Sequence, residues 1–286
     1  MNISKWKLRS KQAYILTKYS IAKALSYFLP LKDSLWLVCE RGTDARDNGY
    51  VFFKYLREYH PEIPCVYAIT KSSADYNKVA CLGNVVRYGS LKHLYYVNNA
   101  THIISTHTSG FLWQSNLVNV QILRRFYRHN AYTVFLQHGI IKDWIVGLTY
   151  PVYRCDLFIC GSKKEYEVIK STYGHPDGVV QYTGLCRFDN LHDFITKKQI
   201  LIMPTWRMYL NHSDEDCFVK SDYYLNFSAI LSNQRVIELL ELYDYELVFY
   251  PHYEMQKYIH LFQSCHERVK IAKFSCYDVQ TLLKDS

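Results

Sequence analysis

Short apolar runs alternate with more polar stretches along most of the chain. Six of them are rich in Val, Ile, Leu and Phe, and each precedes a turn or a stretch of helical character. Runs of this length between turn signals are typical of buried strands. They lie at residues 35–39, 65–69, 85–88, 102–106, 132–137 and 157–161. Their alternation with helical segments predicts a doubly wound α/β sheet.

Capping residues mark the predicted helices of this first series. One helix is expected over residues 48–59, before Pro61, and one over residues 90–99, with Ser90 as its cap.

A further helix is expected from Ser162, which suits an N-cap, to Tyr173, with Gly174 as its stop. We expect three charged side chains on its outer face, Lys164, Glu165 and Glu167.

A second series begins at about Lys197. Strands are predicted at residues 200–204, 246–252 and 268–272, with helices at roughly 227–242, after the second strand, and from Tyr277. Two α/β units in tandem predict a cleft between them, and ligands of such sheets bind beyond the carboxyl ends of the strands. Polar residues stand at several of these ends: His107, His138, Thr205 to Arg207, and His252.

The positive charge of the chain is concentrated at its beginning. Residues 1–32 hold seven of the 34 Lys and Arg residues and none of the 26 Asp and Glu residues, so they account for most of the formal net charge of +8. Aromatic and aliphatic residues alternate with these cations, which predicts an amphipathic helix. Such a helix either lies on an anionic membrane surface or docks on the domain. Because the excess is confined to this segment, a nucleic-acid partner is not expected.

The sequence carries no sign of a membrane span, a metal site or a nucleotide cofactor. Lys18 and Lys23 interrupt the apolar part of the leader, which excludes a span or signal peptide there. The nine cysteines contain no C-x-x-C pair and are expected to be reduced core residues of a cytosolic protein. No glycine-rich phosphate loop is present. We therefore expect no cofactor and no bound metal.

The run FLQHGIIKD, residues 135–143, brings a histidine and a glycine to the end of a predicted strand. Imidazole titrates near neutral pH, which suits acid or base catalysis, and Gly139 allows a substrate to approach closely. A single histidine at such a place is more often structural, and Lys142 and Asp143 are equally compatible with a solvated turn.

Six strings in a fixed order resemble the CDP-glycerol glycerophosphotransferase family, whose members build the poly(polyol phosphate) chains of teichoic acids and capsule polymers. The strings are DNGYVFFKYLREYHPE (47–62), VRYGSLKH (86–93), FLQHGIIKD (135–143), TGLCRFDNL (183–191), ILIMPTWR (200–207) and VFYPHY (248–253). The resemblance covers roughly residues 35–286.

The resemblance implies a GT-B-like enzyme of two Rossmann-like, doubly wound domains that face a cleft. Its expected parts are a basic segment (1–32), an acceptor domain (33–196) and a nucleotide-donor domain (197–286). His138 matches the family histidine that takes the proton of the acceptor hydroxyl, and His252 matches the histidine that contacts the donor's pyrophosphate. Gly139, Lys142, Arg187, Asp189, Thr205 and Arg207 are the expected substrate-binding residues.

The residue types suit this chemistry, because a transferred phosphoryl group needs a base and cations for its charge. Arg187 and Asp189 are alternatively a simple ion pair, and Trp206 a core residue.

Two departures from the family pattern bear on this expectation. Cys186 stands where the family usually has proline, and the family continues past the position of Ser286. We therefore expect the second domain to be incomplete. The alternatives are a GT-B glycosyltransferase that uses a nucleotide sugar, and an inactive truncated protein of the membrane surface.

The partners implied are a CDP-polyol donor, a lipid-linked or polymer acceptor and an anionic membrane surface. The expected location is cytoplasmic, at the inner face of the bacterial cell membrane.

Overall fold

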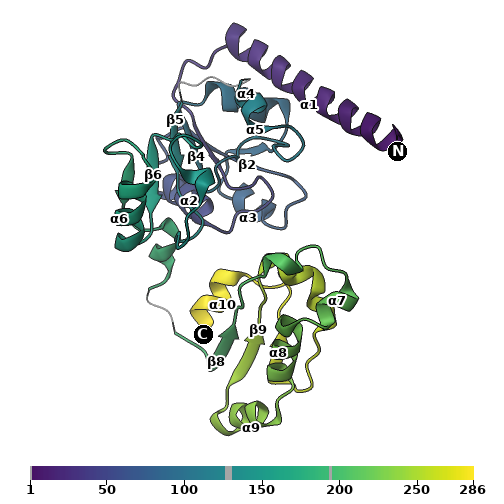
Figure 1. Ribbon diagram of the computed structural model, residues 1–286. Coiled ribbons are helices and arrows are strands. Elements are labelled where there is room, and N and C mark those ends of the chain that lie inside the picture. Colours follow the sequence, from purple (N-terminus) through teal and green to yellow (C-terminus); the bar gives the residue numbers. More distant parts are fainter. Residues whose placement is uncertain (1, 126–130, 193–194) are drawn as a thin grey trace. The chain divides into compact units, whose positions relative to one another are not determined.

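The chain divides into two units, Met1–Asn190 and Leu191–Ser286 (Figure 1). The structure is a computed structural model that describes residues 2–125, 131–192 and 195–286. The division falls a few residues before the one expected from the sequence.

The first unit is built on a parallel sheet of seven strands in the order β3-β2-β1-β4-β5-β6-β7. The strands are β1 (Trp36–Cys39), β2 (Cys65–Ile69), β3 (Val85–Arg87), β4 (His102–Ser105), β5 (Tyr132–Phe135), β6 (Leu157–Cys160) and β7 (Val180–Tyr182). Its helices are α1 (Asn2–Phe28), α2 (Asn48–Tyr59), α3 (Tyr76–Ala80), α4 (Leu91–Asn99), α5 (Val120–Arg124) and α6 (Lys163–Thr172), with 3₁₀ turns η1 (Val146–Leu148) and η2 (Cys186–Asn190). The predicted α/β class is confirmed.

Helices cover both faces of this sheet. On one face Phe53 of α2 and Val79 of α3 pack with Val38 and Ile104 of the strands. On the other face, Leu94 of α4 packs with the neighbouring strand residues, because successive strand side chains point to opposite faces.

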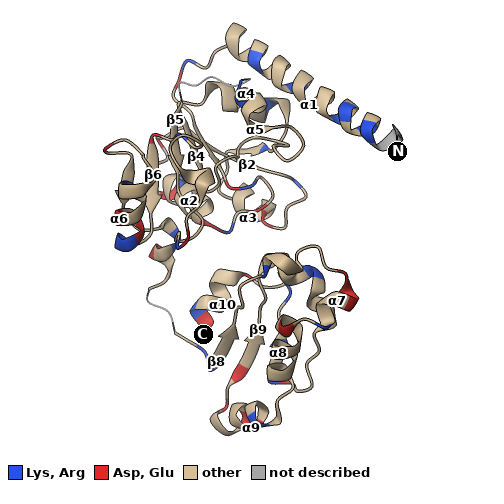
Figure 2. Cartoon of the chain, in the orientation of Figure 1, with Lys and Arg blue, Asp and Glu red and all other residues tan. Residues whose placement is uncertain are grey.

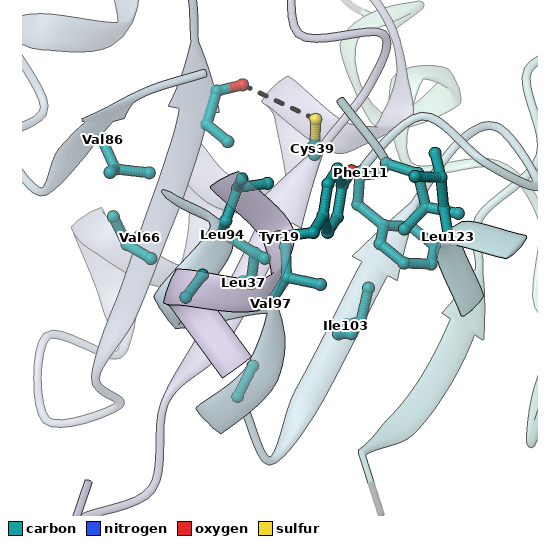
Figure 3. Close-up of a cluster of buried hydrophobic side chains, with 14 of the residues drawn as sticks. Tyr19, Leu37, Cys39, Val66, Val86, Leu94, Val97, Ile103, Phe111 and Leu123 are labelled. Atoms are coloured by element: carbon teal, nitrogen blue, oxygen red, sulfur yellow. Dashed lines mark hydrogen bonds between the residues drawn. The ribbon is translucent and has the colours of Figure 1, made fainter. Parts of the chain in front are cut away.

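The basic helix α1 docks on the second of these faces. Ile15, Tyr19 and Ala22 are fully buried and share a core with α4 and the sheet, as Figure 3 shows for Tyr19 between Leu94, Val97 and Phe111. The Tyr19 hydroxyl donates to the carbonyl of Trp113 at 3.0 Å. The expected amphipathic helix is therefore present, and its apolar stripe packs on the domain.

The outward face of α1 remains exposed and basic. Figure 2 shows its lysine and arginine residues along the helix, without an acidic residue between them. Large apolar side chains lie among them, including Trp6 at 73% and Tyr27 at 80% exposure. None of the helices in the described ranges is both long enough and apolar enough to cross a membrane.

The second unit holds a parallel sheet of three strands in the order β10-β9-β8. Its elements are β8 (Gln199–Ile202), η3 (Met208–Leu210), α7 (Glu215–Val219), α8 (Asp222–Leu231), α9 (Gln234–Tyr243), β9 (Glu246–Phe249), η4 (Tyr253–Leu261), β10 (Val269–Ile271) and α10 (Val279–Asp285). Phe218, Ile237 and Tyr258 pack with Phe249 in one core, while Leu282 of α10 joins a smaller cluster on the other face of the sheet.

Three local predictions were wrong. Strand β7 was missed, because two of its three residues are exposed and it lacks an apolar run. The single helix expected at 227–242 is two helices, since Asn233 accepts a hydrogen bond from the amide of Val236 and starts a new one. Glu165 is not on the outer face of α6: it is buried, at 3% exposure, and points toward the loops that precede it.

Candidate active site

The carboxyl ends of β1, β4 and β5 lie side by side in the sheet of the first unit. Ser105, the last residue of β4, pairs with Cys39, the last of β1, on one side and with Phe135, the last of β5, on the other. The chain reverses its winding direction between β1 and β4, so this edge is the switch point where open α/β sheets bind ligands. His107 follows β4 and His138 follows β5 at this edge.

His138 is exposed, and its tautomer is fixed by the backbone. Its Nδ1 lies 3.0 Å from the carbonyl oxygen of Thr106, which can only accept, so Nδ1 carries the proton. In the neutral ring the lone pair is then on Nε2. No hydrogen-bond partner of Nε2 occurs within the described residues. This arrangement leaves Nε2 ready to accept a proton from a bound hydroxyl.

The residue that precedes His138 has a strained backbone conformation. Gln137 is fully buried and has a left-handed backbone with φ of 64°, which costs a non-glycine residue about 1–2 kcal/mol. Its backbone carbonyl accepts a hydrogen bond from the side chain of Asn48 at 2.7 Å, and its side-chain amide Nε2 donates to a carboxylate oxygen of Glu165 at 3.3 Å. The turn after β5 is therefore held in place by contacts on both sides, which is typical of strain kept at a functional site.

Glu165 ties two loops of the site together. One carboxylate oxygen accepts from the amide of Ile141, in the loop after His138, and the other from the amide of Gly161, both at 2.7 Å. Ser162 and Glu165 have the spacing of a capping box, which predicts that Glu165 turns back toward the start of its helix. Glu165 does so, but it accepts from the amides of Gly161 and Ile141, which the motif does not predict.

Arg187 forms a further contact with the backbone of His138. Its guanidinium donates to the carbonyl of His138 at 3.1 Å and forms an ion pair with Asp47 at 3.0 Å. The suggested ion pair between Arg187 and Asp189 is therefore not formed, and Asp189 is exposed. Burial raises the pKa of Asp47, while the nearby Arg187 lowers it. Asp47 is thus both the N-cap of α2 and the ion-pair partner of Arg187.

The loop after His138 is open to solvent. The space beside Gly139 is open, since a Cβ placed on this residue would meet no atom within 4 Å. Lys142 and Asp143 are exposed and line a groove of about 670 Å³ together with Trp144, Lys164 and Tyr173. Approach to His138 along this loop is therefore not blocked by the backbone.

In the second unit the expected residues also stand at strand ends. Thr205 and Arg207 follow β8 and are exposed; the Arg207 guanidinium donates to the carbonyls of Thr205 and Trp206. His252 follows β9, and its Nδ1 accepts a hydrogen bond from the amide of Glu254 at 3.2 Å. The neutral His252 therefore carries its proton on Nε2, the opposite tautomer from His138. Trp206 stacks on the His252 ring at 6.0 Å and packs against the core of this unit, as the simpler interpretation expected.

Sequence reasoning missed several residues that hold the site. Asp47 and Asn48 lie in the first of the family-like strings but had been given no role, and Gln137 had no signal of its own. Within the described ranges, no group of three or more His, Cys, Asp or Glu residues is arranged to hold a metal ion.

The fold and the site are typical of α/β proteins that bind ligands at the switch point of a parallel sheet, where this chain holds His138 with a fixed tautomer. The family model described as CDP-Glycerol:Poly(glycerophosphate) glycerophosphotransferase matches residues 21–284, and the chain belongs to this family.

One similar curated protein is the minor teichoic acid biosynthesis protein GgaB of Bacillus subtilis (strain 168). It is 29% identical over 253 residues, which cover 84% of this chain and 28% of GgaB. The chain thus spans little more than a quarter of the length of this relative.

Solved structures of the wall teichoic acid polymerase TagF have the same fold. A histidine-to-alanine variant matches with a TM-score of 0.60 at 17% identity, over 100% of this chain and 74% of that one. A variant soaked with CDPG matches with a TM-score of 0.57 at 14% identity, with the same coverage.

Proposed function

We propose that this chain transfers a glycerol-phosphate or ribitol-phosphate unit from a CDP-polyol to a hydroxyl of a lipid-linked or polymer acceptor, in teichoic acid or capsule synthesis. The observation that carries the proposal is the fixed tautomer of His138, whose Nε2 lone pair faces solvent at the switch point of the sheet. Membership of the glycerophosphotransferase family supports the choice of donor.

In the proposed reaction the acceptor hydroxyl attacks the phosphorus that bears the polyol. Its oxygen forms the new phosphodiester bond while the bond from this phosphorus to the bridging oxygen of the pyrophosphate breaks. The proton of the hydroxyl passes to Nε2 of His138, and CMP leaves with the electron pair of the broken bond. The hydrogen bond from Nδ1 to Thr106 stabilises the imidazolium that forms, since the carbonyl remains its acceptor.

The second unit is the proposed donor-binding domain of a GT-B-like pair. His252 presents its protonated nitrogen as a donor to the pyrophosphate oxygens, and Arg207, which is exposed, adds a positive charge. Thr205 and Lys142 are further proposed donors to phosphate. Asp189, exposed next to the Arg187 segment, is proposed to bind polyol hydroxyls.

The test measures CMP release from CDP-glycerol and CDP-ribitol with a prenyl-linked acceptor. His138→Ala should lower kcat by at least 100-fold, because the loss of a general base typically costs 10²–10⁴-fold. His60→Ala, a change at another partly exposed histidine of the same unit, is the matched control and should leave kcat unchanged. Absence of CMP release from both donors, or a preference for a UDP- or GDP-sugar, contradicts the proposal.

We propose that the outward face of α1 binds an anionic membrane at its inner, cytoplasmic side. Its cations Lys5, Lys7, Arg9 and Lys11 are exposed beside Trp6, which suits a helix lying on lipid headgroups. Changing the four cations to Glu should abolish sedimentation with phosphatidylglycerol vesicles. The control changes three exposed lysines of α6, Lys163, Lys164 and Lys170, to Glu. Equal loss in both variants would indicate unspecific charge attraction and contradict this surface.

A further inference from the structure

Arg41 and His107 occupy equivalent positions on either side of the switch point. Cys39, the last residue of β1, pairs in register with Ser105, the last residue of β4. Two residues further on, each strand delivers one of the pair to the same edge of the sheet. Arg41 Nε lies 2.9 Å from His107 Nε2, so the two side chains bridge the position where ligands of open α/β sheets bind.

The protonation state of His107 follows from this contact. Arginine stays charged in proteins, so its Nε–H donates and His107 Nε2 must hold a lone pair. The proton is then on Nδ1, which lies 2.9 Å from the hydroxyl of Thr106. Burial, with the nearby His138 and Arg41, lowers the pKa of His107 to about 3. A group that is neutral and already hydrogen-bonded at both nitrogens does not serve as the base.

Stacking connects this pair to the proposed base. The rings of His107 and His138 lie with their centroids 4.3 Å apart and their planes 11° from parallel. One face of His138 is therefore covered by His107. The guanidinium of Arg41 donates to the edge of the His107 ring, so a single residue, His107, separates it from His138.

The terminal nitrogens of Arg41 are available to a ligand. Its side chain is exposed, and within the described residues only Nε makes a hydrogen bond. The other arginines near the start of α2 are already neutralised, Arg187 by Asp47 and Arg46 by Asp75. Asp44 lies close enough for Arg41 to lower its pKa, but forms no ion pair with it. Arg41 is thus a partly unneutralised cation whose paired N–H groups match two oxygens of a phosphate.

We propose that Arg41 binds the phosphodiester next to the attacking hydroxyl of the acceptor, and that His107 is the positioning residue that holds Arg41 in register with His138. The inference rests on the proposed function, and it names the acceptor class as one that already carries a phosphodiester in its terminal unit. A terminal polyol separates that phosphodiester from the hydroxyl by only a few bonds, so an anchor one residue from the base fixes the hydroxyl at Nε2.

The kinetic test uses the full chain with a short glycerol-phosphate oligomer as acceptor. Arg41→Ala should raise the acceptor KM at least tenfold and leave the donor KM within twofold. Arg87→Ala removes the same charge from an exposed position on β3 and is the control that should change neither. An acceptor KM equal to that of the control, or a rise confined to the donor KM, overturns the proposal.

Two substitutions separate the two contacts of His107. His107→Phe keeps a ring on His138 but removes the acceptor for Arg41, so it should raise the acceptor KM as Arg41→Ala does, and the double variant should be no worse than either. His107→Gln keeps an acceptor for Arg41 and should leave the acceptor KM closer to that of the unchanged chain. Additive effects of Arg41→Ala and His107→Phe would show that the residues act independently and refute the positioning role.

A binding measurement keeps the inference testable if the chain releases no CMP, a result that would refute the proposed function alone. Glycerophosphoglycerol, titrated calorimetrically, should bind the unchanged chain and bind Arg41→Ala at least tenfold more weakly. Equal binding to both would overturn the phosphodiester site whether or not turnover occurs.

Discussion

Replacing Glu165 should destabilise the first unit through two backbone amides. Glu165→Ala removes the acceptors of the Ile141 and Gly161 amides. A buried donor without a partner costs about 1–3 kcal/mol, so the two together cost about 2–6 kcal/mol. Because both residues are only half-buried, we expect the lower half of this range, about 3 kcal/mol. Glu165→Gln keeps one acceptor oxygen and should cost about half as much.

Hydrogen exchange of individual amides, followed by NMR, is the most direct assay. A loss of about 3 kcal/mol corresponds to roughly 100-fold faster exchange at Ile141 and Gly161, since each 1.4 kcal/mol is tenfold. The control is Glu167→Ala, which removes an exposed carboxylate from the same helix. The proposed bridging role of Glu165 is refuted if exchange at the two amides is as slow in Glu165→Ala as in the control. It is equally refuted if the two variants unfold within 0.5 kcal/mol of each other in urea.

Three further predictions concern the rest of the molecule. Tyr19→Ala should lower the free energy of unfolding by about 3–5 kcal/mol, as substitutions of other buried aromatic residues do. Tyr14 is exposed, so Tyr14→Ala should change this free energy little. Equal effects of the two substitutions in urea titrations would refute the docking of α1. Burial, and secondarily Lys18, lowers the pKa of His93 to about 3. In the unfolded chain the pKa of His93 is near 6.5, so below this pH the unfolded chain binds a proton at His93 that the folded chain does not. The free energy of unfolding therefore falls with falling pH by up to about 1.4 kcal/mol per pH unit. His93→Leu should flatten this slope between pH 5 and 6, and an unchanged slope would contradict the prediction. Burial raises the pKa of Cys155 and of Cys160 to about 12, so a thiol reagent at pH 8 should label exposed cysteines and leave these two unmodified in the mass spectrum unless the protein is first unfolded.

The strands of the sheets could be predicted because their burial requires apolar side chains. All six strands predicted in the first unit and all three in the second are present. Strand β7 was not predicted. It is an edge strand with one buried residue, and its backbone hydrogen bonds to β6 do not require any particular residue type. A strand can be recognised from sequence when its residues are buried and therefore apolar, and an exposed edge strand has few such residues.

The orientation of the site residues could not be predicted in the same way. His138 was recognised by its motif, but the position of its proton depends on the carbonyl of Thr106, a backbone atom that sequence does not reveal. His107 was noticed only as a residue at a strand end. Its contact with Arg41 joins positions 66 residues apart, and neither residue type identifies the other as its partner.

The left-handed turn at Gln137 has a consequence for how His138, the proposed base, could respond to different acceptors. Contacts at Thr106, Asn48, Glu165 and Arg187 hold the backbone and ring of His138 before any substrate arrives. The entropy of orienting the base is therefore lost once, when the chain folds, rather than at each turnover. A base held this rigidly cannot follow a displaced hydroxyl, so an acceptor of different spacing would react slowly even when it binds well. In the proposed reaction, selection between acceptors would then appear in kcat, and affinity alone would be a poor guide to which acceptor reacts.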